Sequence, residues 1–194
     1  MHGFINGLAR TFAMLGGIVL TALILLTCLS IVGRTLNTFL HGELSQSLLP
    51  GFAAAALDWG VGPIKGDFEI VEAGMAFAIF AFLPLCQLNG AHASVDIFTA
   101  KLSERANRFL RSIIEVVFAA VVVMITVQLF VGMLSKQSAG ETSFYLEFPI
   151  WWAYAFSLVA AVAAAVVATY MALMRVAESA IGIRILPPEM ESEH

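Results

Sequence analysis

The sequence has little charge for its length. Only 12% of its 194 residues are charged, 60% are hydrophobic, and the mean hydropathy is +0.89. A soluble domain carries about 25% charged residues, so this chain does not have enough polar surface to cover a water-soluble globule. In lipid, apolar side chains need no such cover. The composition therefore indicates an integral membrane protein.

Residues that carry chemistry are also scarce. The two cysteines, Cys28 and Cys86, lie inside apolar runs and form no C-x-x-C pair, which argues against a thiol-redox enzyme. No histidine falls in the middle of an apolar run, so haem ligation between membrane helices is excluded. The motifs H-E-x-x-H and G-x-S-x-G are missing. Ten scattered Lys and Arg residues do not make a nucleic-acid surface. The sequence predicts no enzyme, no cofactor and no nucleic-acid partner.

The sequence does contain four long apolar stretches, at about residues 11–33, 69–89, 112–134 and 149–174. Each is long enough to cross a membrane, and a segment in lipid must be helical to satisfy its own backbone. The first stretch is too long for the core of a signal peptide, so we expect it to be retained. The prediction is an all-α membrane protein with a single domain over residues 1–194, four transmembrane helices, and a disordered tail at 186–194.

Lysine and arginine residues set the expected orientation. With four spans, both termini and the middle connection lie on one side, which carries seven of these residues. The other side carries three, namely Arg34, Lys65 and Lys136. Because cytoplasmic loops are enriched in Lys and Arg, we expect both termini in the cytoplasm.

The middle connection contains a basic segment at about 94–111. On a helix, Val95, Phe98, Leu102, Ala106 and Phe109 would share one stripe, with the cations on another face. This pattern predicts an amphipathic helix on the cytoplasmic membrane surface, in contact with phospholipid headgroups. An ordinary solvated loop is the alternative. The lipid-facing cations would be Lys101, Arg105, Arg108 and Arg111.

Charged residues stand at the ends of the spans. Arg34 follows the first span, and Glu69 and Glu72 open the second on the same side. An Arg–Glu pair would lower the cost of holding charges near lipid; contact with a partner subunit, or simple exposure to water, are the alternatives. Glu115 lies four residues after Arg111, so we expect a local ion pair there.

His92 and Asp96 are the closest approach to a metal site. They lie four residues apart and would share a helical face. Two potential ligands do not make a metal site, so we expect none. Asp96 or Ser94 is a better candidate for the cap of a helix N-terminus.

Taken in order, these elements resemble the small membrane subunit of tripartite ATP-independent periplasmic (TRAP) transporters, the DctQ-type family. The residues that carry the resemblance are Gly33-Arg34, the acidic pair Glu69 and Glu72, the G-x-H-x-x-V-D element with Gly90, His92, Val95 and Asp96, and the Pro-x-Trp-Trp start of the fourth span with Pro149, Trp151 and Trp152. They run through almost the whole apolar part of the chain.

The resemblance implies a non-catalytic subunit in the bacterial inner membrane. Its expected partners are a large M-type permease subunit that carries the substrate and sodium sites, and a periplasmic solute-binding protein that delivers an organic acid. An ion gradient would drive uptake. The family-motif residues would then be contacts with the partner or with the membrane interface.

Two other hypotheses remain open at this point. A self-sufficient homodimeric four-helix transporter would need a glutamate near mid-span, whereas Glu72 and Glu115 lie near span ends. A four-helix membrane enzyme would have to use Arg34, Glu69 and Glu72. The alanine-rich run at 159–168 either packs within the four-helix unit or faces a partner. The role of the long outer loop, 34–67, is also open; it is expected to contain a short helix near 48–57.

Overall fold

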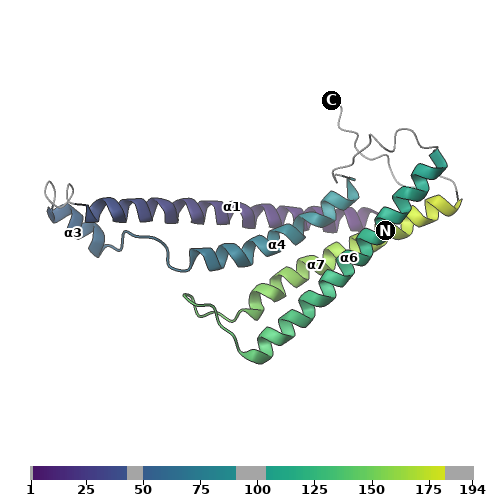
Figure 1. Ribbon diagram of the computed structural model, residues 1–194. Coiled ribbons are helices and arrows are strands. Elements are labelled where there is room, and N and C mark those ends of the chain that lie inside the picture. Colours follow the sequence, from purple (N-terminus) through teal and green to yellow (C-terminus); the bar gives the residue numbers. More distant parts are fainter. Residues whose placement is uncertain (1, 43–49, 91–103, 182–194) are drawn as a thin grey trace.

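The computed structural model describes residues 2–42, 50–90 and 104–181. Within these ranges its regular secondary structure is helical, and the loops contain one isolated antiparallel bridge, between Thr142 and Pro149. Four helices are long and apolar enough to cross a membrane, which confirms the predicted fold class. The helices are α1 (His2–His41), α3 (Pro50–Asp58), α4 (Asp67–Leu88), α6 (Glu104–Ala139) and α7 (Trp151–Ile181), shown in Figure 1.

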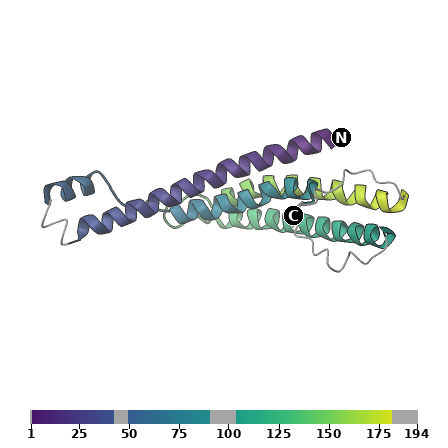
Figure 2. The same ribbon diagram turned by 90° about the horizontal axis from the view of Figure 1, so that it is seen from above.

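Three of the long helices extend past the apolar stretches that predicted them. At 1.5 Å per residue, the 40 residues of α1 make a rod of about 60 Å, twice the roughly 30 Å of membrane hydrocarbon. The 22 residues of α4 match that thickness. The C-terminal end of α1 and the short helix α3 therefore project beyond the other helices, as both views show (Figures 1 and 2).

The basic residues of the middle connection lie on a spanning helix. Helix α6 begins at Glu104 and continues without a break into the third apolar stretch. Residues 104–111 therefore continue α6 and do not form the separate surface helix expected over 94–111. The reason is that no Gly or Pro occurs between Arg105 and Val131 to stop the helix. Residues 94–103, with Asp96 and Lys101, lie outside the described part of the chain.

The four long helices form an open layer in the order α6, α7, α4, α1 (Figure 2). Each packs along its neighbour in this order, and α1 touches α7 over only a short stretch. In the most apolar 18-residue segment of each helix, half of the α7 residues are buried, compared with 11% of the α6 residues. Helix α7 is therefore the most buried of the four, and α6 and α1, at the two edges of the layer, present most of their apolar side chains outward.

Small side chains let the central helices approach closely. Ala164 and Ala168 of α7 are buried against Ala119 and Val122 of α6. The hydroxyl of Thr126 donates across the same interface to a backbone oxygen of α7, that of Ala161, at 3.3 Å. The alanine-rich run thus packs within the molecule, because a short side chain at each contact permits backbone proximity.

Candidate functional site at the starts of α4 and α7

The connection between α6 and α7 folds into a small hairpin over residues 141–150, here called the α6–α7 hairpin. Gly140 ends α6 in the left-handed conformation, with φ of 64°. Two backbone hydrogen bonds then close the hairpin, from Ser143 to Phe148 at 2.9 Å and from Ile150 to Glu141 at 3.0 Å. Pro149 therefore belongs to the hairpin. Helix α7 begins at Trp151, and not at Pro149 as the sequence predicted.

Glu69 ties this hairpin to α4. Its carboxylate accepts hydrogen bonds from the backbone N–H groups of Tyr145, at 2.8 Å, and Leu146, at 3.1 Å. The Glu69 residue is only 7% exposed. The ring of Phe68 meets that of Tyr145 edge to face, with centroids 5.9 Å apart. A buried carboxylate in the first turn of a span is therefore satisfied by two backbone donors more than 70 residues away in the sequence.

The turn before α4 depends on a glycine at this contact. Gly66 has φ of 75° and lies directly under Leu146. A Cβ atom at residue 66 would come within 2.6 Å of the Leu146 Cγ. Glycine is needed at this position both for its backbone conformation and for the close approach of the hairpin.

The pair between Arg34 and the two glutamates is one of three alternatives that the sequence left open, and it is not seen among the described residues. Arg34 is exposed, and within the described residues no ion pair joins it to Glu69 or Glu72. The acidic residue near α1 is Asp67, whose carboxylate accepts a hydrogen bond from the Ser30 hydroxyl at 2.5 Å. Glu69 points instead to the hairpin, and α1 packs on a different side of α4.

The glycine of the Gly33-Arg34 element has a packing role. A Cβ atom at Gly33 would lie 2.2 Å from the backbone oxygen of Gly62, so the loop before α4 runs directly against α1. Four residues further on, the Asn37 side chain donates to the Val61 backbone oxygen at 2.9 Å. These contacts fix the loop to the projecting part of α1.

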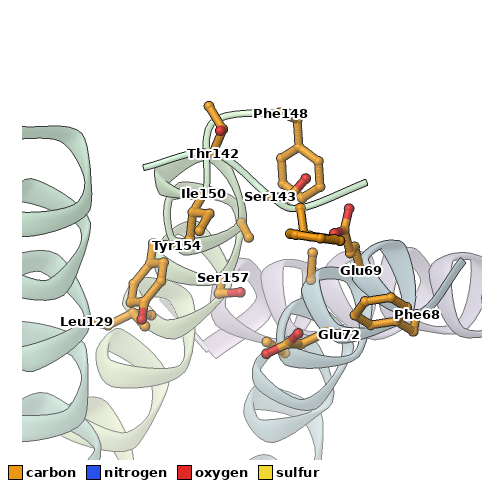
Figure 3. A pocket seen from close by; sticks show the side chains of 14 residues that line it. Phe68, Glu69, Glu72, Leu129, Thr142, Ser143, Phe148, Ile150, Tyr154 and Ser157 are labelled. Carbon is orange, nitrogen blue, oxygen red and sulfur yellow. The ribbon is translucent and has the colours of Figure 1, made fainter. Parts of the chain in front are cut away.

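Between the hairpin, α4 and α7 lies a cavity of about 580 Å³ (Figure 3). Glu69 and Glu72 both line it, so the structure brings the predicted acidic pair to one site. The two carboxylates differ, because Glu69 is buried and bonded to backbone whereas Glu72 is exposed. Most of the remaining wall is apolar, formed by Phe68, Ala73, Ala76, Leu129, Phe144, Phe148, Ile150 and Ala153.

A second set of polar contacts closes the opposite end of the layer. The Gln87 amide donates to the Glu115 carboxylate, linking α4 to α6. The Ser112 hydroxyl donates to the Arg175 backbone oxygen at 2.9 Å, and Arg175 pairs with the buried Glu178 at 3.3 Å. Sequence reasoning missed these contacts. For Arg175 and Glu178, which both lie on α7, the spacing of three residues was the available signal.

Groups that could carry chemistry are few in the part of the chain that the structure describes. Within the described residues, no group of three or more His, Cys, Asp and Glu side chains could hold a metal ion. Cys28 and Cys86 are both free. No charged residue occurs between Glu72 and Leu88, or between Glu115 and Lys136. A proton or ion path needs such groups at mid-depth.

The comparisons with known proteins agree with this picture. A family model described as "Tripartite ATP-independent periplasmic transporters, DctQ component" matches residues 23–178, which is most of the chain. The chain belongs to this family. No curated protein and no solved structure matches it.

Family membership makes the chain a small subunit of a TRAP transporter, in the inner membrane, and a transporter component rather than an enzyme. Such subunits work within tripartite transporters together with other subunits. The match covers both the hairpin contact at Glu69 and the opposite polar contacts up to Glu178. Both sets of contacts therefore lie in the part of this DctQ-type subunit that the family model matches.

The other motif residues have separate positions in this DctQ-type subunit. Trp151 and Trp152 form the first turn of α7, with ring centroids 6.1 Å apart, and Trp152 is 49% exposed. Gly90, with φ of 62°, lies two residues after the end of α4 and stops that helix. His92, with Asp96, falls outside the described residues.

Proposed function

We propose that this DctQ-type subunit is a non-catalytic scaffold for a large M-type permease subunit. In this proposal the permease carries the substrate and sodium sites, a periplasmic solute-binding protein delivers an organic acid, and the ion gradient drives uptake. The small subunit enlarges the fixed body against which the transporting part of the permease moves.

The observation that carries this proposal is where the charged residues lie. In the described helices the charged residues that make contacts lie toward the ends of the layer. Asp67 and Glu69 accept hydrogen bonds at one end. Glu115, Arg175 and Glu178 form the polar contacts at the other end. The mid-depth parts are apolar, and α6 and α1 turn large aliphatic side chains outward. A subunit that moves no solute itself and packs against a larger one needs only such a surface.

The test is uptake into proteoliposomes under an imposed sodium gradient, with a panel of radiolabelled carboxylates. Three preparations are compared: the small subunit alone, the permease with the binding protein, and all three proteins together. The scaffold proposal expects uptake only from the complete set. Uptake by the small subunit alone would overturn it and would favour the homodimeric transporter.

The orientation with both termini in the cytoplasm is part of the proposal. Arg10 and Arg105 lie in the first parts of α1 and α6, and Arg175 lies in the last part of α7. These helix ends gather on one side of the layer, and the connection between α6 and α7 lies on the other (Figure 1). In a variant without the native cysteines, Glu147→Cys should react with an impermeant maleimide added to intact spheroplasts. Arg105→Cys should react only after the membrane is opened. The reverse labelling pattern would contradict the orientation.

A further inference from the structure

Ser157 differs from three threonines of the described helices in its hydrogen bonding. Thr21, Thr126 and Thr169 each donate to the backbone oxygen four residues earlier, as hydroxyls in apolar helices commonly do. Ser157 is only 2% exposed, yet its Oγ has no hydrogen-bond partner among the described residues. It lines the cavity between α4, α7 and the hairpin. A buried hydroxyl without a partner costs free energy unless something else fills its place.

Glu72 lines the same cavity from the other side (Figure 3). Among the described residues it takes part in no ion pair, and no Lys, Arg or His lines the cavity. Glu72 lies five residues after the start of α4, or about 7–8 Å along a helix that just matches the membrane thickness. A carboxylate exposed at that depth is costly without a cation beside it.

The shape and charge of the cavity point to one kind of ligand. A volume of about 580 Å³ is in the range of small-molecule sites. Its walls are apolar, including Leu129 and Phe148, and its polar groups are acidic carboxylates and hydroxyls. A ligand that fits must bring a positive charge for Glu72, an oxygen acceptor for Ser157 and apolar groups for the walls.

We propose that this cavity binds the headgroup of an ammonium-bearing phospholipid. The lipid ammonium group pairs with the Glu72 carboxylate, and the Ser157 hydroxyl donates to an oxygen of the headgroup or glycerol. The start of the acyl chains lies against the apolar wall. Because the Glu72 side chain is exposed, a lipid can reach its carboxylate from outside the helix layer.

The test measures which lipid stays bound to the full chain. The protein is reconstituted in vesicles of equal parts phosphatidylethanolamine and phosphatidylglycerol, re-extracted in mild detergent, and examined by native mass spectrometry. The wild type should retain phosphatidylethanolamine in excess over phosphatidylglycerol. Glu72→Gln should retain roughly tenfold less, because a charge-assisted hydrogen bond is lost. Ser157→Ala should retain an intermediate amount.

The matched control is Glu147→Gln, which neutralises an exposed carboxylate of the hairpin that does not line the cavity. It should retain as much lipid as the wild type, and circular dichroism should show all variants equally helical. Equal retention by wild type and Glu72→Gln would overturn the proposal. So would retention of the two lipids in the proportion of the vesicles. The same measurement on the subunit bound to its permease should again find the lipid; its absence there would mean that protein fills the cavity, and would also overturn the proposal.

Discussion

Glu69→Gln should release the α6–α7 hairpin from α4. The carboxylate of Glu69 now accepts one backbone N–H on each oxygen, from Tyr145 at 2.8 Å and from Leu146 at 3.1 Å. An amide keeps one acceptor oxygen but places its NH₂ group against the other backbone donor. One charge-assisted bond is therefore lost and the other is weakened, so the hairpin should open roughly ten times more often.

The assay is amide hydrogen exchange, followed residue by residue in the hairpin with the protein in nanodiscs. Exchange should rise at Tyr145 and Leu146, while amides in the middle of α7 keep their protection, because the opening is local. Glu147→Gln is the control, since it removes a nearby charge without touching these bonds. If Glu69→Gln and Glu147→Gln exchange alike in the hairpin, Glu69 does not hold it and the reasoning fails.

Two predictions concern packing, and thermal unfolding in detergent measures both. Gly33→Ala should lower the melting temperature, because its Cβ would lie 2.2 Å from the Gly62 backbone oxygen and force the loop away, at a cost of about 1–3 kcal/mol. Gly17→Ala, which has open space around the new Cβ, should not destabilise, and equal losses in both would contradict the packing argument. Ala164→Leu should be destabilising by a similar amount, because residue 164 is 3% exposed between α6 and α7. Val162→Leu, 47% exposed on the same helix, should have little effect; equal stability of both variants would refute the close α6–α7 contact.

The four spanning helices could be predicted because their signal is local. A run of about 20 apolar residues is sufficient to indicate a helix in lipid, whatever it packs against. The helix ends were less predictable. The apolar stretches show which residues can contact lipid, but α1 and α6 continue as helices beyond them into polar sequence. In α6, no Gly or Pro between Arg105 and Val131 breaks the helix.

The site was predictable in its residues but not in its partners. Glu69 and Glu72 were identified from their position at a span end, yet nothing near them in the sequence indicates that Glu69 would meet the backbone of Tyr145. That contact joins residues 76 apart, and it depends on how the hairpin folds over α4. The role of Ser157 could not be predicted from the sequence. A serine in an apolar helix is common, and only the structure shows that its hydroxyl has no hydrogen-bond partner among the described residues.

The central claim is that this DctQ-type subunit supports a larger permease. The most direct test is affinity purification of the chain from its native membranes in mild detergent, with mass spectrometry of the proteins that co-elute. The account predicts a large, very hydrophobic permease in near-equal amount. Recovery of the 20.8 kDa chain by itself, as a monomer or homodimer, would contradict the account.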